Sequence, residues 1–417
     1  MWYDEYLDRI DTALADEDKK LALRRATSTF LLKKRDALGS LPYLDYYRKR
    51  LREVKAWSID HIDELIKTFK ENFEALGGIV HIVSTKEELA NVLRKVIGSG
   101  KLVIKSKSMT SEELEVNKQL EEMGNTVVET DLGERIVQLM GCRPSHVVVP
   151  AIHLTKEKVA DLFSKVTGER VPPDPKAIVG VARRMLRDLY MKADVGISGA
   201  NAIAAETGSI LVLENEGNAR FVTNAPPVHV VIAGIEKLVP TLEDAMLIAQ
   251  VLPPYATGQR MATYLSIISG PSSTADIELT SVRGAHGPME VHVVLVDNGR
   301  RRMLRDSRFK QALYCIRCGS CLNNCPIYQL LGDEFGYRYF GGIGTIWTAF
   351  TEGLKVAAPL AYACTLCGRC KLECPLELDI PEMVKSLRDL LIKEGYIPPP
   401  LSFAERSIIE KGNPMGI

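Results

Sequence analysis

The chain has 417 residues, enough for two or three domains, and its 46% hydrophobic and 25% charged residues are typical of a globular protein. Its 53 basic residues balance its 53 acidic residues, so the net charge gives no indication of nucleic-acid binding. No apolar run approaches the roughly 20 residues that span a bilayer, and the acidic N-terminal segment does not resemble a signal peptide. We therefore expect a cytoplasmic protein that reaches a membrane only through a partner.

Residues 1–75 form the first predicted unit, a helical arm, because apolar residues recur there at helical spacing among many charges. From about Gly77, short apolar strands alternate with amphipathic helices. This alternation predicts an α/β domain with a largely parallel sheet, which we place at residues 76–299. The predicted strands are 79–83, 102–105, 126–129, 146–149, 195–198, 210–213, 228–233, 264–269 and 291–296. The predicted helices are 86–97, 111–123, 155–166, 176–191 and 242–251, and 272–288 is predicted to be a surface loop.

Residues 300–395 form the third predicted unit, which begins with a basic helix over 300–313 and contains most of the cysteines. The 38 residues between Cys325 and Cys364 form a longer spacer than a compact symmetric ferredoxin would have. We therefore predict an α-helical ferredoxin domain with a helix after each cysteine run. The remaining residues, 396–417, contain several prolines and are predicted to be an extended tail on the surface or on a partner.

Eight of the nine cysteines lie in two copies of the spacing C-x2-C-x2-C-x3-C-P. This pattern is typical of ferredoxins with two [4Fe–4S] clusters, in which the fourth cysteine of each run ligates the other cluster. Zinc favours two cysteine pairs separated by a longer loop, and disulfides need an oxidising compartment, so both fit less well. A purely structural cluster pair is the remaining alternative. The two predicted ligand sets are Cys315, Cys318, Cys321 and Cys374, and Cys364, Cys367, Cys370 and Cys325.

Three residues of the α/β domain are candidates for a catalytic or binding site. Lys105 and Lys107 end a predicted strand, and Glu206 lies in a turn before another. Ligand sites in open α/β sheets form at the carboxyl ends of the strands, so we expect these three side chains to line one pocket. Two ammonium groups beside one carboxylate suit a small anion with a titratable proton.

Other polar residues of the α/β domain have a simpler explanation. His146, His153 and His229 are each more readily explained as structural residues with satisfied hydrogen bonds. The ninth cysteine stands alone and is predicted to be small and buried. No G-x-G-x-x-G run follows a strand, so the chain has no dinucleotide fingerprint. The residues considered are His146, His153, His229, Cys142, Asn201, Asn215 and Asn218.

Long strings of this sequence resemble the iron–sulfur subunit of bacterial and archaeal L-lactate utilisation systems, which carries a LUD domain. They are 105–109 (KSKSM), 129–134 (ETDLGE), 145–153 (SHVVVPAIH), 193–201 (ADVGISGAN), 205–209 (AETGS), 215–218 (NEGN), 226–229 (PPVH), 234–244 (GIEKLVPTLED) and 297–300 (DNGR), followed by both cysteine runs. The resemblance covers nearly the whole chain. It implies a LUD domain with a fold like sugar-phosphate isomerases and CoA transferases.

The resemblance also implies a partnership with a cysteine-rich-domain redox subunit and a second LUD-domain subunit or a flavoprotein, which together oxidise L-lactate to pyruvate without NAD. Related chains serve other electron donors, including heterodisulfide-reductase-like complexes, and family members usually extend well beyond the second cysteine run. In a third hypothesis the LUD domain is a docking platform that catalyses nothing. Clusters carry single electrons whereas lactate releases two, so a two-electron centre is required. This chain shows no flavin motif, and we expect any flavin on a partner.

Overall fold

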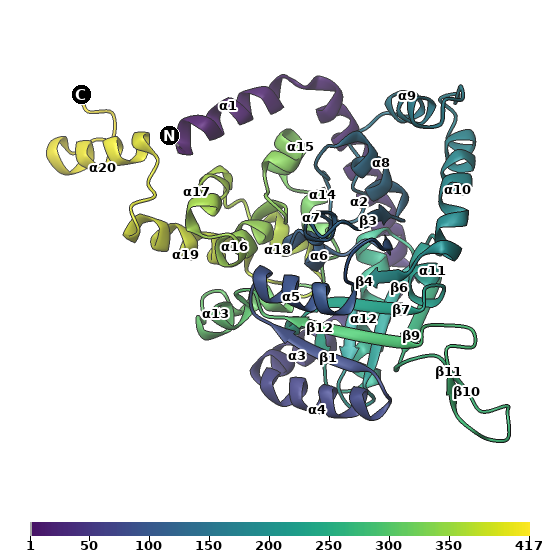
Figure 1. Cartoon of the computed structure of the whole chain (residues 1–417). Coiled ribbons are helices and arrows are strands. Elements are labelled where there is room, and N and C mark those ends of the chain that lie inside the picture. Colours follow the sequence, from purple (N-terminus) through teal and green to yellow (C-terminus); the bar gives the residue numbers. More distant parts are fainter. Residues whose placement is uncertain (1) are drawn as a thin grey trace.

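The computed structural model describes residues 2–417 and confirms a mixed α/β protein with a helical N-terminus (Figure 1). The arm wraps around the rest of the chain: α1 and α2 contact the cysteine-rich region, and α4 packs on the main sheet. The packing of α4 follows from its sequence, because Ile62, Leu65, Ile66, Phe69 and Phe73 recur at helical spacing and are all buried. The arm consists of α1 (Trp2–Ala15), α2 (Glu17–Gly39), α3 (Leu44–Asp60) and α4 (Ile62–Ala75).

The main sheet has six parallel strands in the order β1-β12-β7-β4-β2-β3. Its strands are near-continuous apolar runs, as expected when helices cover both faces of a sheet. One face packs on α4 and the other on α5 and α7. The strands are β1 (Ile79–Val83), β2 (Leu102–Lys105), β3 (Thr126–Glu129), β4 (Val195–Ser198), β7 (Val228–Gly234) and β12 (Glu290–Val296). The helices among them are α5 (Lys86–Val96), α6 (Met109–Glu113), α7 (Val116–Glu122), α8 (Leu132–Met140), α9 (Lys156–Thr167), α10 (Pro175–Lys192) and α11 (Asn218–Asn224).

A second, four-stranded sheet was not predicted and holds two of the strands expected in the main one. Its order is β8-β5-β6-β9, and the hairpin of β5 and β6 is antiparallel. The helix α12 packs on it and begins with a capping box at Thr241 and Asp244. The elements are β5 (Ala202–Ala204), β6 (Ser209–Glu214), η1 (Ile235–Lys237), β8 (Leu238–Val239), α12 (Leu242–Ala256) and β9 (Tyr264–Ile268). The predicted surface loop carries a small projecting ribbon of β10 (Ser273–Thr274) and β11 (Val282–Arg283) (Figure 1).

The strand predicted over 146–149 is wrong, because this segment is a loop. The Nδ1 atom of His146 accepts hydrogen bonds from the backbone N–H groups of Val148 and Val149, at 3.0 and 3.1 Å. These N–H groups are then not available to a neighbouring strand, although the three valines have high strand propensity.

The C-terminal region is helical around the cysteines, and two details of its prediction are wrong. The basic helix expected over 300–313 is split into α13 and η2, and the tail expected to be extended contains α20. Proline at the start of α20 fixes a helical φ, and Gly412 in the left-handed region ends it. The elements are α13 (Arg300–Arg305), η2 (Lys310–Tyr314), α14 (Ser320–Asn323), α15 (Pro326–Leu331), η3 (Gly332–Glu334), α16 (Gly341–Thr351), α17 (Leu354–Ala363), α18 (Arg369–Glu373), α19 (Ile380–Lys393) and α20 (Pro399–Lys411).

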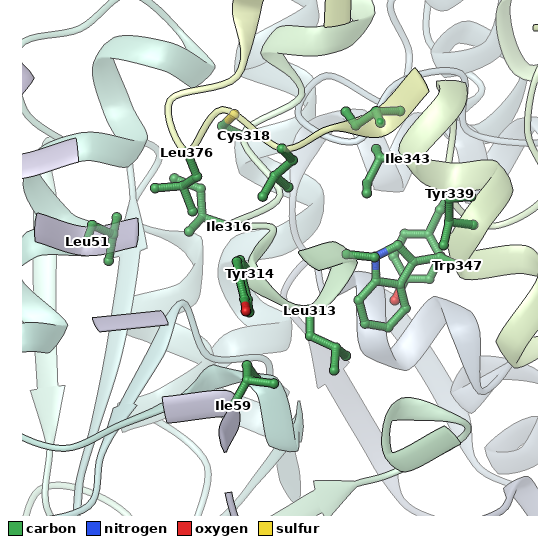
Figure 2. Close-up of a cluster of buried hydrophobic side chains, with 14 of the residues drawn as sticks. Leu51, Ile59, Leu313, Tyr314, Ile316, Cys318, Tyr339, Ile343, Trp347 and Leu376 are labelled. Carbon is green, nitrogen blue, oxygen red and sulfur yellow. The ribbon is translucent and has the colours of Figure 1, made fainter. Parts of the chain in front are cut away.

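One hydrophobic core joins the arm, the second sheet and the cysteine-rich region (Figure 2). Leu51 and Ile59 of α3 belong to the same buried cluster as Ile316 and Cys318 of the first cysteine run. Trp347 of α16 is only 1% exposed and closes this core on its other side. The first cysteine run thus lies within the core that the arm, the second sheet and the cysteine-rich region share. No helix among residues 2–417 combines the length and the apolar character needed to cross a bilayer.

Candidate functional site

The first cysteine run lines a small, mostly apolar cavity. Cys315, Cys318 and Cys321 face it together with Cys374, which comes from the end of the second run. The indole and phenol rings of Trp347 and Tyr339 also line it, with Ile343, Leu376 and Leu378. The cavity therefore combines four thiols with a wall that excludes water.

A second small cavity holds the second cysteine run. It is lined by Cys364, Cys367 and Cys370, and by Cys325 from the end of the first run. Cys321 lines both cavities, so the two lie next to each other. Each cavity contains all four cysteines of one predicted ligand set, and the second also contains Cys321.

The two runs share one backbone conformation, which explains how each presents three thiols to one cavity. Arg317 and Leu366, at equivalent positions, have φ of 63° and 56°, and Gly319 and Gly368 have φ of 72° and 78°. Left-handed conformations in quick succession turn the chain tightly, and glycine adopts them without steric cost. Pro326 and Pro375 follow the fourth cysteines and allow a helix or turn to start there at once.

The environment of these thiols fits a bound iron–sulfur cluster. Burial raises the pKa of Cys318 to about 12 and that of Cys325 to about 11, and the neighbouring cysteines add to both shifts. Four neighbouring thiolates would repel one another in this environment, so a cationic centre is needed to hold them, and iron would supply one. The N–H groups of Ile327 and Tyr328 donate to the Cys325 sulfur, which is the usual way that ferredoxins stabilise cluster ligands.

A third and larger cavity, of about 380 Å³, lies at the carboxyl ends of β2, β3 and β4. Lys107 follows β2, Asp131 follows β3, and Asn201 follows β4. Glu216, just after β6, and Lys237, at the end of η1, complete its polar lining. It is the place where an open α/β fold is expected to bind a ligand.

This third cavity shares a wall with the first cysteine cavity. Val147, Ile316 and Arg317 line both. Since Ile316 and Arg317 lie between Cys315 and Cys318 in the sequence, a ligand in the larger cavity would be separated from the thiols by this wall alone.

The ionisable groups of the larger cavity are strongly perturbed. Burial, together with the carboxylate of Asp131, raises the pKa of Glu216 to about 7. Burial lowers the pKa of Lys107, whose Nζ lies 3.9 Å from a carboxylate oxygen of Glu134. Burial also lowers the pKa of Lys237 to about 8, although Glu236 opposes this shift. Perturbed groups that gather in one cavity are typical of binding and catalytic sites.

Of the three residues predicted to line one pocket, the structure places only Lys107 in the larger cavity. Lys105 is completely buried and does not line the cavity, and its Nζ lies 2.9 Å from Glu112 and 2.8 Å from Glu129. Glu206 is exposed in the turn that joins β5 to β6, whereas the cavity lies at the opposite end of that hairpin, near Asn201 and Glu214. The expected grouping of all three is therefore wrong.

Sequence reasoning missed Glu216, Lys237 and Arg317. Glu216 lies in the string 215–218, and Lys237 lies in 234–244, both of which contributed to the family resemblance. A signal was thus present, since both follow strands. No sequence signal connects Arg317 with the α/β domain, because that contact depends on how two distant regions pack.

The other polar residues have mainly structural roles, but the expectation that the histidines have all their hydrogen bonds satisfied is wrong, because one ring nitrogen each of His146, His153 and His229 has no partner among residues 2–417. His229 is buried and its Nε2 lies 2.8 Å from the hydroxyl of Ser198 on the neighbouring strand. His146 is 1% exposed and stacks on Phe30 of α2. Cys142 is only partly buried, with its sulfur 3.8 Å from His153. The oxygen atoms of Asn201 and Asn215 accept backbone hydrogen bonds, and Asn218 donates to Thr130.

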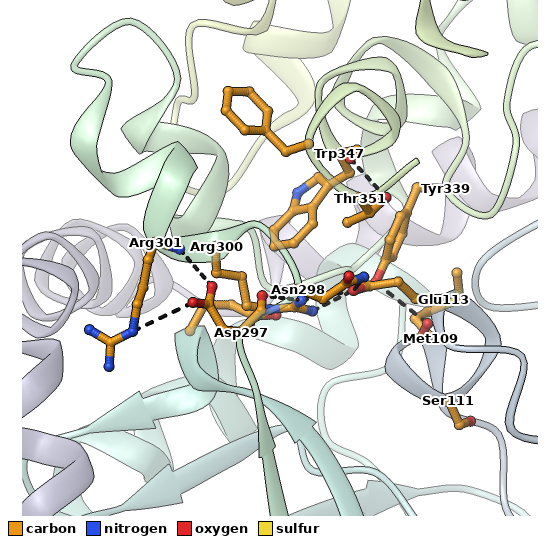
Figure 3. Close-up of polar contacts among 12 residues, drawn as sticks. Met109, Ser111, Glu113, Asp297, Asn298, Arg300, Arg301, Tyr339, Trp347 and Thr351 are labelled. Carbon is orange, nitrogen blue, oxygen red and sulfur yellow. Dashed lines mark hydrogen bonds and ion pairs between the residues drawn. The ribbon is translucent and has the colours of Figure 1, made fainter. Parts of the chain in front are cut away.

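A buried network of charged and polar groups includes Glu113, Arg300 and Tyr339 (Figure 3), and its second carboxylate, Glu236, binds Arg317. The carboxylate of Glu113 binds the two terminal nitrogens of Arg300, at 2.8 and 2.9 Å. Glu236 bridges Arg300 and Arg317, at 2.5 and 3.1 Å. The hydroxyl of Tyr339 donates to Glu113 at 2.5 Å, and the guanidinium of Arg317 stacks over the same ring. The network thus connects the α/β domain with the first cysteine run, in which Arg317 lies between Cys315 and Cys318.

The LUD domain model matches residues 66–296, and the 4Fe-4S dicluster domain model matches residues 311–378. Lactate utilization protein B of Shouchella clausii (strain KSM-K16) is 36% identical over 390 residues, 93% of this chain and 80% of that protein. Lactate utilization protein B of Geobacillus sp. (strain WCH70) is 34% identical over 396 residues, 94% of this chain and 82% of that protein. A solved DUF162 family protein from Deinococcus radiodurans is 16% identical, with a TM-score of 0.30, and covers 56% of this chain and 98% of that chain.

Proposed function

This chain belongs to the LUD-domain family that includes the Lactate utilization protein B sequences, and from that premise we propose that it is the iron–sulfur electron-transfer subunit of a complex that oxidises L-lactate to pyruvate. One observation carries the electron-transfer role. Eight cysteines from two runs of the same spacing line two adjacent cavities, four in the first and five in the second, with Cys321 shared. Two adjacent clusters form a path for electrons, whereas one structural centre would need only one cavity.

The chain binds two [4Fe–4S] clusters with exchanged fourth ligands. Cys374 completes the set of Cys315, Cys318 and Cys321, and Cys325 completes the set of the second run. The support is the cavity lining, in which each fourth cysteine faces the other run. The exchange makes both runs one folding unit, since neither set is complete without the other.

The clusters, when bound, accept and release single electrons. The residues of the chain hold them and control access. Trp347, Tyr339 and Ile343 keep water from the first cavity, and Arg317 places a positive charge beside Cys315 and Cys318. Cys367 is exposed, so the second cavity lies closer to the protein surface.

Partners complete the reaction. Lactate oxidation releases two electrons, so a two-electron centre has to precede the clusters. We place it on a cysteine-rich-domain redox subunit, a second LUD-domain subunit or a flavoprotein, and the absence of a dinucleotide fingerprint from this sequence favours a route that does not use NAD. The complex works in the cytoplasm, with any membrane contact supplied by a partner.

A second candidate function is electron transfer from another donor, with the LUD domain as a docking platform. It is favoured by the position of Glu206, the carboxylate that the sequence analysis expects in the ligand pocket, because Glu206 lies outside the larger cavity. The larger cavity and its perturbed carboxyl and ammonium groups favour the first candidate.

The test is anaerobic purification of the complex with its partners, followed by addition of L-lactate, other 2-hydroxy acids or reduced flavoproteins. We expect L-lactate to reduce the clusters, seen as bleaching of their visible absorbance and as an electron paramagnetic resonance signal. The control is the same complex without the cysteine-rich-domain subunit. Cluster reduction by a flavoprotein but not by L-lactate would establish the second candidate instead.

A further inference from the structure

The larger cavity is lined by three cationic and three acidic side chains, and several of its cationic donors have no hydrogen-bond partner among the described residues. The Nε and Nη1 atoms of Arg317 are buried and, among residues 2–417, have no hydrogen-bond partner. The same holds for Nζ of Lys107. Lys237 forms no ion pair with any residue that the structure describes. A buried donor without a partner is costly, and a charged one more so, which favours an anionic ligand here.

Two of the cations, Arg317 and Lys237, lie on the side of the cavity that faces the first cysteine run. Arg317 lines both cavities and lies 3.1 Å from the carboxylate of Glu236, the residue before Lys237, so both cations lie near the shared wall. Glu236 already binds Arg300, so its charge is divided among several cations. The guanidinium of Arg317 is held flat over the rings of Trp347 and Tyr339, at 3.8 and 4.2 Å from their centroids, so it is fixed before a ligand arrives.

Acidic groups on other parts of the lining restrict the charge of the ligand. Asp131, Glu214 and Glu216 all line the cavity. A second negative charge on the ligand would approach these carboxylates and be repelled. A hydroxyl group would instead donate a hydrogen bond to one of them. The chemistry therefore selects a monoanion with a polar group beside the carboxylate, and disfavours dicarboxylates and phosphate.

We propose that the larger cavity binds the carboxylate of a short 2-hydroxy or 2-oxo monoacid, with Lys237 and Arg317 as the groups that hold it against the wall shared with the first cluster. This deepens the proposed function, on which the choice of acid rests. Val148, Leu213 and Ile316 offer apolar contacts for the alkyl side chain. A cavity of about 380 Å³ exceeds the needs of a three-carbon acid, so acids with longer side chains fit as well.

The test is isothermal titration calorimetry of the full chain, purified anaerobically with its clusters, against L-lactate, pyruvate, L-2-hydroxybutyrate, succinate and inorganic phosphate. We expect the three monoacids to bind and the other two to bind at least tenfold more weakly. Lys237→Met should weaken pyruvate binding about tenfold to a hundredfold, the range for one charge-assisted hydrogen bond. Lys176→Met, at an exposed lysine of α10, is the matched control and should bind as the wild type does.

Iron content and the electron paramagnetic resonance spectrum show whether each variant keeps its clusters. If Lys237→Met loses them, Lys107→Met serves as the second variant. Equal pyruvate affinity in the wild type and in Lys237→Met overturns the proposal, as does tighter binding of phosphate. If Lys237→Met shifts the midpoint potential of the first cluster but leaves affinity unchanged, the cations serve the cluster alone. Turnover of L-lactate by the complex without binding by this chain would refute the cavity assignment and leave the proposed function intact.

Discussion

Removing the charge of Glu113 should destabilise the junction between the α/β domain and the cysteine-rich region. Its carboxylate is completely buried and accepts hydrogen bonds from Arg300 at 2.8 and 2.9 Å, from Tyr339 at 2.5 Å and from Asn298 at 2.6 Å. In Glu113→Gln, an amide N–H group faces these donors and Arg300 keeps only Glu236 as a carboxylate partner. Breaking a buried ion pair from one side costs about 3–5 kcal/mol, so we expect a loss of that size.

The assay is urea unfolding under anaerobic conditions, followed by circular dichroism and by cluster absorbance, whose transitions should coincide if unfolding is cooperative. Asp63→Asn is the control, because it breaks the exposed ion pair of the adjacent Arg301 and should cost at most about 1 kcal/mol. A double variant, Glu113→Leu with Arg300→Met, should lose less than Glu113→Gln, since no charge is left buried alone. Equal midpoints for Glu113→Gln and Asp63→Asn would refute the reasoning.

Three further predictions concern the two kinds of site. Cys325→Ser should alter the electron paramagnetic resonance spectrum of the cluster bound by the second run and spare that of the first; the reverse pattern would contradict ligand exchange. Pyruvate binding should weaken as the pH rises through about 7, because the Glu216 carboxyl then gains a negative charge, and calorimetry on Glu216→Gln should show a flatter pH profile. Lys105→Met should lower the free energy of unfolding by about 3–5 kcal/mol, because Glu112 and Glu129 lose their buried partner. A stable variant that loses turnover would instead restore a catalytic role for Lys105.

The elements of the main sheet were predictable because their signal is local. Each of its six strands is a short apolar run, and the helices between them carry one apolar face. The spacing of each cysteine run and the proline after it predict that the fourth thiol is directed away from the other three, and Cys374 and Cys325 each line the cavity of the other run.

The second sheet was not predictable from local patterns. The first four residues of β6 are buried, so it has the same apolar pattern as a central strand of the parallel sheet. Its partner β5 is the alanine-rich segment Ala202–Ala204, which has little strand propensity of its own and pairs only because the fold brings it to β6. The wrong position expected for Glu206 has the same cause, because the hairpin turns this residue away from the carboxyl ends of the main sheet.

The most informative feature of the site depends on contacts between distant parts of the chain. Val147 comes from a loop that His146 keeps out of the sheet, and Ile316 and Arg317 come from the first cysteine run, yet all three form the wall between the two cavities. Because Arg317 is tied through Glu236 and Arg300 to Glu113, the wall is fixed by buried ion pairs from the α/β domain. A change of charge on a ligand on one side of this wall would act on the thiolates of the proposed first cluster on the other, because the interior between them has a low dielectric constant. The proposed ligand site and the proposed first cluster would therefore be coupled by the packing of the α/β domain against the cysteine-rich region.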